Sequence, residues 1–334
     1  MNALPPQVQA PLRQQAIAET MWDLRHRQIL VPLLRDLHGA GIKTVLLKGT
    51  ALAYSVYGSP AERPRGDTDM LVHESQVPAA RAILARHRFR RTSERDAERA
   101  PQEEWRLEQK DGGTHCIDMH WNLLSGWALS SLFDTGSIIK GAVDLPLLGT
   151  VARMPAPETA LLHACVHRAQ HFSGAYFVGT EVTYAGDRLI WFVDMDLLSR
   201  RLTPEQWQAV LSDATRTGTT GIAHEALQEC QRRLGTPVPQ QILTRLKAVD
   251  GDTLAERYLI RASFLKRLWT NIRSLPAGGS RIAFLCEIFL PAEKVMRQAY
   301  PELADKSLAR LHLHRYRERV QRLRKERKQR PKSS

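Results

Sequence analysis

The chain has 334 residues, of which 43% are hydrophobic and 25% are charged, and its formal net charge is +13 at pH 7. This length and balance exclude a disordered chain and favour one large globular domain or two ordinary ones. The four cysteines form no Cys-x-x-Cys pair, so they predict reduced thiols rather than a disulfide framework or a zinc site. No stretch is long and apolar enough to span a bilayer, and residues 1–15 lack the apolar region of a signal peptide. We therefore expect a cytoplasmic protein.

The first 72 residues predict a helix, a strand, a second helix and a second strand, in that order. Apolar residues recur at helical intervals between residues 15 and 38, which indicates one long helix. The apolar run Thr44–Leu47 predicts a short buried strand, and the turn Lys48-Gly49-Thr50 opens a helix that continues to about Tyr57. The segment 58–66 is rich in Gly, Pro and Arg and cannot continue that helix. Residues 67–72 predict the next strand.

Two carboxylates, Asp67 and Asp69, lie at the start of this second strand. Side chains two positions apart on a strand point to the same face, so both carboxylates can reach one cation. Mg2+ prefers such oxygen ligands. The Gly49-Thr50 turn, at a helix N-terminus, offers backbone N–H groups to anionic oxygens. A carboxylate pair and an anion-binding turn in this order predict a site that handles phosphates with a metal ion.

A third carboxylate, Asp118, is expected beside this pair. Segments 104–108 and 114–121 flank Asp111-Gly112-Gly113 and predict a hairpin. On the second strand of that hairpin Asp118 lies between two apolar residues, so it points to the opposite face from them, together with His120. His120 is then either a packed, hydrogen-bonded histidine beside the site or a group that contacts the acceptor.

These motifs resemble a family of uncharacterised bacterial nucleotidyltransferases in the DNA-polymerase-beta-like superfamily. The positions that match the pattern of this family are Leu47-Lys48-Gly49, Tyr57, Arg63, Asp67–Val72, Asp118, His120 and Trp121. Thr50 stands where Ser or Gly is usual, and its hydroxyl keeps a contact to phosphate open. The resemblance implies an α+β fold, with a polymerase-beta-like nucleotidyltransferase core of a small mixed sheet and helices, followed by an α-helical domain.

The resemblance also implies a reaction, in which a nucleoside monophosphate passes from an NTP such as ATP to an acceptor hydroxyl and pyrophosphate is released. The metal-binding and catalytic residues would be Asp67, Asp69 and Asp118. They would hold two Mg2+ ions, or Mn2+ instead, and Asp118 would help to deprotonate the acceptor. The turn would cradle the triphosphate while nearby cations offset its charge. The nucleotide-binding residues expected on this basis are Lys48, Gly49, Thr50, Arg63 and Arg65.

Two other functions stay open at this point. The chain fits a catalytically inactive nucleotide- or RNA-binding protein of the same fold, although three intact carboxylates count against that reading. It also fits a nucleotidyltransferase of the toxin–antitoxin type that modifies a partner protein. The additional helical half favours instead an acceptor site of its own.

Beyond residue 155 the sequence predicts mostly helix. Pro155-Ala156-Pro157 marks a boundary, which gives an N-terminal helix over 1–40, a core over 41–155, a helical domain over 156–311 and a basic tail over 312–334. His163, His167 and His171 recur every four residues and share one helical face. Three histidines on one helix are poorly placed to bind one ion, so we expect them to face the sheet, where His167 and His171 contact nucleotide or acceptor. Asp194 is expected to form an ordinary inter-helix hydrogen bond or, as the family resemblance implies, to partner His167 or His171. The Gly-rich segment 173–187 is expected to be a mobile loop over the site or a connector.

The C-terminal segment holds most of the excess positive charge. Residues 315–334 carry ten Lys or Arg against two Glu. Such a run is either a solvated tail or a binding segment for a polyanion, and RNA is the first candidate partner for Arg315–Lys332. Tyr316 is the one aromatic residue of this segment, so it offers no stacking platform for single strands. The sequence predicts no particular oligomeric state.

Overall fold

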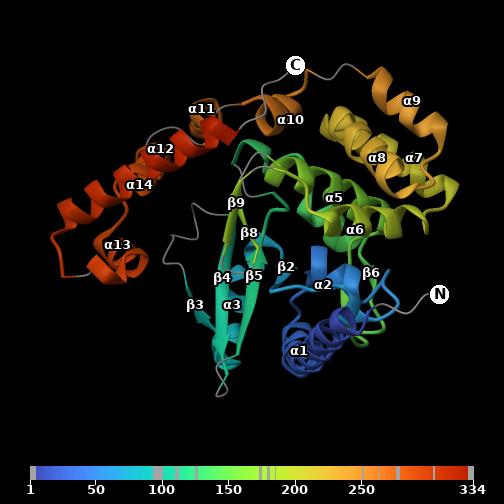
Figure 1. The fold of residues 1–334 in the computed structure, drawn as a ribbon, viewed down its shortest axis with the longest axis horizontal. Coiled ribbons are helices and arrows are strands. Elements are labelled where there is room, and N and C mark those ends of the chain that lie inside the picture. The colour runs from blue at the N-terminus through green and yellow to red at the C-terminus, as the bar shows by residue number, and fades with distance from the viewer. Residues whose placement is uncertain are drawn as a thin grey trace.

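The centre of the molecule is a mixed sheet (Figure 1). The computed structural model describes residues 5–92, 101–109, 113–124, 127–172, 175–178, 181–184, 186–249, 252–262, 264–275, 279–303 and 305–329. The five strands have the order β1-β2-β5-β4-β3; β2 and β5 run parallel, and the other neighbours are antiparallel. Their bounds are β1 Val45–Leu46, β2 Asp67–Leu71, β3 Arg90–Arg91, β4 Gln102–Glu108 and β5 Thr114–His120. This sheet with its helices confirms the predicted α+β fold.

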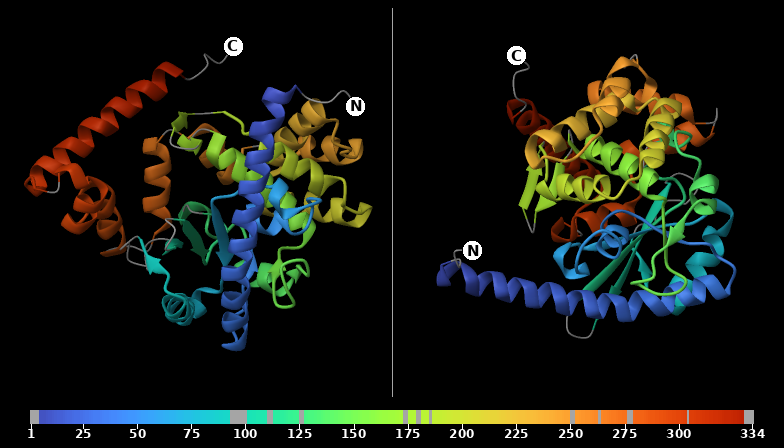
Figure 2. Two further views of the ribbon diagram at one scale, coloured as in Figure 1. Left: turned by 60° about the horizontal axis from the view of Figure 1, so that its bottom comes forward. Right: turned by 90° about the vertical axis from the view of Figure 1, so that its right-hand side faces the viewer.

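Helix α1 (Pro6–Gly39) packs on the core with its C-terminal half only. Leu30, Leu33 and Leu37 are buried, whereas Ile17 and Met21 are more than half exposed. Figure 2 shows the N-terminal part of this helix extending beyond the body of the protein. The remaining elements around the sheet are α2 (Lys48–Ala53), η1 (Pro60–Glu62), η2 (Glu74–Gln76), α3 (Val77–Arg86), η3 (Trp127–Leu129), α4 (Thr135–Lys140) and the hairpin of β6 (Val143–Asp144) and β7 (Arg153–Met154).

The helical half is organised around α5 (Pro157–Phe172), which contacts α6, α7 and α8. A second hairpin, β8 (Ala175–Val178) and β9 (Glu181–Tyr184), lies between α5 and α6 in the chain. The helices are α6 (Leu189–Ser199), α7 (Pro204–Thr217), α8 (Thr220–Leu234) and α9 (Gln240–Ala248). One cluster of buried apolar side chains runs from α1 and the sheet through α5 to α9. The division into domains at residue 155 therefore stays a prediction, because both halves share this core.

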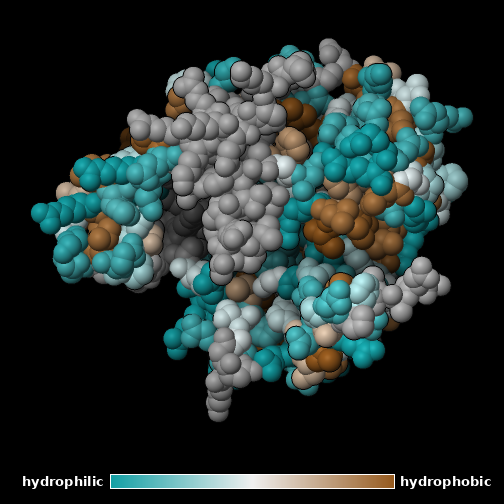
Figure 3. All heavy atoms as spheres, viewed as in Figure 1, coloured by the Kyte–Doolittle hydropathy of each residue, from teal (hydrophilic) through white to brown (hydrophobic). Residues whose placement is uncertain are grey.

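The C-terminal elements form an arm beside the sheet (Figure 1). They are α10 (Leu254–Glu256), the π-helical turn η4 (Arg257–Arg261), α11 (Phe264–Ser274), α12 (Gly279–Phe289), α13 (Glu293–Ala299), η5 (Pro301–Leu303) and α14 (Leu308–Gln329). The outer part of the arm, where α14 lies, presents mostly hydrophilic side chains (Figure 3). Within the described ranges, every helix is too short or too polar to cross a membrane.

Several element bounds differ from the predictions. The first helix begins at Pro6 rather than near residue 15, because proline at the first helical position lacks only an N–H that the helix does not use. The second helix begins at Lys48 and ends at Ala53, where Tyr54 leaves the helix and donates a hydrogen bond to Asp23 of α1. Most of the expected loop 173–187 is the hairpin β8–β9.

Candidate active site

The parallel pairing of β2 and β5 brings two of the predicted carboxylates together. Asp69 is the direct cross-strand partner of Asp118, and Asp67 is the partner of Cys116. Asp67, at the first position of β2, is exposed, whereas Asp69, two residues further along the strand, is buried. All three carboxylates line one cavity of about 340 Å³. Asp69 and Asp118 therefore share one face of the sheet beside a space large enough for a ligand.

A histidine joins this pair. Ligand atoms of Asp69, Asp118 and His120 lie within 4.8 Å of one another, and within the described part of the chain this is the one such group of three. His120 Nε2 donates a hydrogen bond to Asp69 Oδ1 at 2.9 Å. Its buried Nδ1 has no hydrogen-bond partner among the described residues. The two carboxylates suit Mg2+ or Mn2+, and an imidazole nitrogen suits a transition-metal ion. The cluster could therefore hold a divalent cation, and the orphaned ring nitrogen supports a role for His120 there.

Lys48 contributes the nearest positive charge. Its Nζ lies 2.6 Å from Asp69 Oδ1, the oxygen that also accepts from His120. The residue adopts a left-handed backbone conformation, with φ of 46°, which is uncommon for a residue other than glycine. This conformation at the junction of β1 and α2 turns the side chain toward the carboxylates, and Gly49 lines the same cavity.

The carboxylates titrate unusually because the walls of the cavity remove part of their solvent. This desolvation, and next to it the negative charge of Asp69, raises the pKa of Asp118 to about 7 and that of Asp67, which keeps some exposed surface at the strand end, to about 6. Burial acts in the same sense on Asp69, but the ammonium group of Lys48 and the hydrogen bond from His120 hold its pKa well below the usual range. The three acids thus bring together more negative charge than Lys48 neutralises, and a divalent cation would supply the difference.

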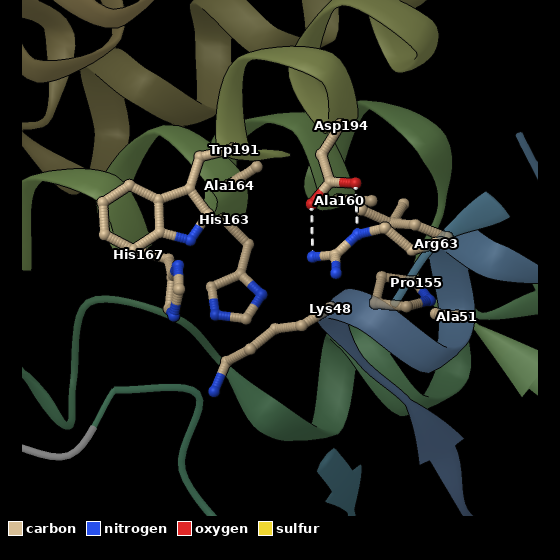
Figure 4. Close-up of a pocket in the computed structure, with 11 residues that line it drawn as sticks. Lys48, Ala51, Arg63, Pro155, Ala160, His163, Ala164, His167, Trp191 and Asp194 are labelled. Atoms are coloured by element: carbon tan, nitrogen blue, oxygen red, sulfur yellow. Dashed lines mark hydrogen bonds and ion pairs between the residues drawn. The ribbon is translucent and has the colours of Figure 1, made fainter. Parts of the chain in front are cut away.

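The two predicted phosphate-binding arginines are paired with acids. Arg63 forms two hydrogen bonds to Asp194, at 2.7 and 2.8 Å, and the Tyr57 hydroxyl donates to the same carboxylate. Arg65 pairs with Asp23 of α1. Asp194 was expected to form an inter-helix hydrogen bond or to partner His167 or His171, whereas its described partners are Arg63 and Tyr57. Both arginines fix the loop before β2, and Figure 4 shows the pairing of Arg63 with Asp194.

Arg63 and Arg65 line the cavity, but Thr50 is not among its lining residues. It is buried, with its hydroxyl 3.3 Å from that of Thr68 and 3.4 Å from the carbonyl oxygen of Asp67. Its side chain thus supports the start of β2, and the predicted phosphate contact of its hydroxyl stays a prediction.

The helical half supplies the opposite side of the cavity. His167 and His171 of α5 and Trp191 of α6 line it, together with Arg188 at the N-terminal end of α6. His163, one turn earlier on α5, is buried. Figure 4 shows the Lys48 side chain extending below the rings of His163 and His167. Sequence analysis did not single out Trp191 or Arg188, because an aromatic residue in an apolar helix and an arginine at its start are ordinary features.

Comparison with known proteins places this chain in a sequence family. The sequence profile of a family described as uncharacterised nucleotidyltransferases matches residues 1–235. A solved structure, that of an antigenic nucleotidyltransferase-like protein from Paracoccidioides brasiliensis, is similar at 14% sequence identity with a TM-score of 0.43, over 66% of this chain and 92% of that chain. No match to a curated protein was found. With most of its length matched by the family profile, the chain belongs to the uncharacterised nucleotidyltransferases.

Proposed function

We propose that the protein transfers a nucleoside monophosphate from an NTP to an acceptor hydroxyl, in a reaction that depends on Mg2+ or Mn2+ and releases pyrophosphate. The observation that carries this proposal is the pairing of Asp69 with Asp118 on adjacent parallel strands, with Lys48 on Asp69. In phosphoryl-type transfer the protein mainly positions groups and neutralises charge. A buried acidic cluster beside a cation, open to a cavity, is suited to that work.

Each residue then has a distinct role. Asp69, Asp118 and His120 would hold the cation, with Asp67 at the exposed strand end available to a second one. Such cations stabilise the attacking and leaving oxygens of the transfer. Asp118, which lines the cavity beside Asp69, would also be placed to accept the proton of the acceptor hydroxyl.

Lys48 and the backbone of Gly49 would contact the triphosphate. Arg63 and Arg65 would act at one remove, since their ion pairs with Asp194 and Asp23 fix the loop that leads into Asp67. His167 and His171 would face the nucleotide or the acceptor from the helical half.

The test is incubation with Mg2+ or Mn2+ and each α-labelled NTP, with RNA, protein and small-molecule fractions as acceptors. Pyrophosphate release together with transferred label supports the proposal, and the labelled fraction identifies the acceptor class, including the protein target of a toxin–antitoxin enzyme. Asp69→Asn and Asp118→Asn should abolish both signals. Asp144→Asn, which removes an exposed carboxylate on β6, is the matched control and should leave them unchanged. If the protein binds NTP but releases pyrophosphate under none of these conditions, an inactive nucleotide-binding protein is favoured instead.

A further inference from the structure

The cavity beside the carboxylates has a second wall of a different chemical kind. One wall, from β2 and β5, carries Asp67, Asp69 and Asp118, and the other, from α5 and α6, carries the imidazole, indole and guanidinium groups of His167, His171, Trp191 and Arg188. In the proposed function, the carboxylate wall binds the metal ions and, through them, the phosphates. The proposed function turns His167 and His171 toward the nucleotide or the acceptor, but it does not say which part of that ligand the helical wall binds.

The rings of the helical wall lie close together but are tilted to one another, with interplanar angles of 50° between His167 and His171, 89° between His167 and Trp191, and 41° between His171 and Trp191. The centroids of His167 and His171 lie 4.4 Å apart, and that of Trp191 lies 5.7 Å from the first and 6.1 Å from the second. Arg188 lies over the Trp191 ring, with its guanidinium carbon 5.9 Å from the ring centroid. Trp191 is buried, whereas His167 and His171 are half-buried and Arg188 is exposed. The two imidazoles and the Arg188 guanidinium are therefore the accessible part of the wall.

The wall carries little charge for its size. Burial, and next to it the positive charge of Lys48, lowers the pKa of His167 and of His171, so both imidazoles are neutral at neutral pH. Among the other cations that line the cavity, Lys48, Arg63 and Arg65 each pair with a carboxylate. A second polyanion would find only Arg188 as a cation on this wall, and a metal ion would find no acidic side chain among its described residues.

Flat, neutral rings beside a guanidinium plane are the groups on which proteins stack heteroaromatic bases. We infer that His171, Arg188 and Trp191 form a subsite for the planar heteroaromatic base of a nucleotide whose phosphates lie at the carboxylate wall. The base stacks on His171 and the Arg188 guanidinium, with Trp191 as the support that holds both. This inference rests on the proposed function for the position of the phosphates, while the stacking surface itself is independent of any reaction.

Calorimetry with the full-length protein and Mg2+ separates the base from the phosphates. The ligands are tripolyphosphate, the α,β-methylene analogues of the four NTPs, and the corresponding free nucleosides. For the wild type, at least one NTP analogue should bind more tightly than tripolyphosphate. In the variant His171→Ala/Arg188→Gln this advantage should fall about tenfold, the effect of losing one stacked base, while tripolyphosphate affinity changes less than twofold. His224→Ala and Arg216→Ala, on α8 and α7 away from the cavity, are the matched controls.

The outcomes distinguish the inference from the function on which it rests. If the double variant weakens tripolyphosphate and the NTP analogue equally, Arg188 is a phosphate ligand and the base subsite is refuted. The base subsite is also refuted if the wild type binds NTP analogues no more tightly than tripolyphosphate. In both cases the proposed nucleotidyl transfer is not contradicted. If no triphosphate binds but nucleosides bind in a manner that depends on His171, the subsite is upheld and the proposed function fails. If nothing binds, both fail.

Two sources of the base are separated by competition. A nucleoside that displaces the NTP analogue shares its subsite, so the base is that of the donor. A nucleoside that binds the NTP-loaded protein, and loses this binding in the double variant, places the base of an acceptor on the same wall. Each result supports the stacking subsite and names the ligand that occupies it.

Discussion

Removing one partner of the ion pair between Arg63 and Asp194 should be among the most destabilising single changes in the protein. Both side chains are buried, at 11% and 7% exposure, and they join the loop before β2 to α6 through two short hydrogen bonds. Asp194→Ala leaves a buried guanidinium without its carboxylate and the Tyr57 hydroxyl without its acceptor. Removing one partner of such a pair costs about 3–5 kcal/mol of the free energy of unfolding. Tyr57→Phe, which removes one hydrogen bond only, should cost about 1 kcal/mol.

A double-mutant cycle turns this magnitude into a test of mechanism. Arg63→Met and Asp194→Leu together replace both charges by apolar groups of similar size, so the double variant should lose less stability than Asp194→Ala alone. Urea unfolding, followed by circular dichroism and tryptophan fluorescence, gives the free energies where the two curves coincide. Arg200→Ala, which breaks an exposed pair on the same helix, is the control and should leave the unfolding midpoint unchanged. A loss below about 1 kcal/mol for Asp194→Ala would refute the structural role argued for this pair.

Four further results are expected. Because the pKa values of Asp67 and Asp118 are raised to about 6 and 7, metal binding must displace protons, so Mg2+ affinity should rise from pH 5 to 8 and then level off. Calorimetry in buffers of different ionisation heat should show this proton release. A pH-independent affinity would contradict the raised pKa values. In the metal-free protein the same raised values mean that stability falls as pH rises from about 4 to 7, a decrease that added Mg2+ should reverse in thermal unfolding. Lys48→Met removes the cation on Asp69, so turnover should fall about 100-fold or more while metal affinity rises; unchanged turnover would exclude Lys48 from the reaction. Glutamine in place of every Lys and Arg of 315–332 should reduce the salt dependence of RNA binding and leave transfer to a small acceptor intact. The slope of log affinity against log salt concentration should shrink by about 0.7 for each phosphate that the tail no longer neutralises. An equal slope would show that the tail neutralises no phosphates.

The carboxylates were predictable because local rules decide their placement. Period-two alternation puts Asp67 and Asp69 on one face of a strand, and the apolar neighbours of Asp118 turn it to one face of its own strand. What the sequence left open was the register between β2 and β5. The structure makes Asp69 the direct partner of Asp118, and it brings His120 into ligand distance of both. An unremarkable Asp-x-His spacing on the second strand was the available signal.

The acidic partners of Arg63 and Arg65 could not be predicted because they are distant in the chain, and a contact of either arginine with phosphate stays a prediction. Arg63 precedes Asp194 by 131 positions, and Arg65 follows Asp23 by 42. No local pattern pairs residues across such separations, so two cations just before a pair of carboxylates suggested phosphate binding. One signal did exist, since Asp23 is an acidic residue within the long helix α1 whose side chain is largely buried. A buried charge requires a partner, and the neighbouring loop is rich in arginine.

This pairing of cations has a consequence for how a triphosphate can bind. Lys48, Arg63 and Arg65 each neutralise a carboxylate of the protein, and Arg188 lies over an indole ring at the far wall. A triphosphate that enters the cavity also meets Asp67 and Asp118, whose charges oppose its own. Binding therefore has to be coupled to divalent cations, which turn the acidic wall from a repulsive surface into an attractive one. NTP affinity that is strong without any divalent cation would contradict this charge distribution, and with it the roles proposed for Asp67, Asp69 and Asp118.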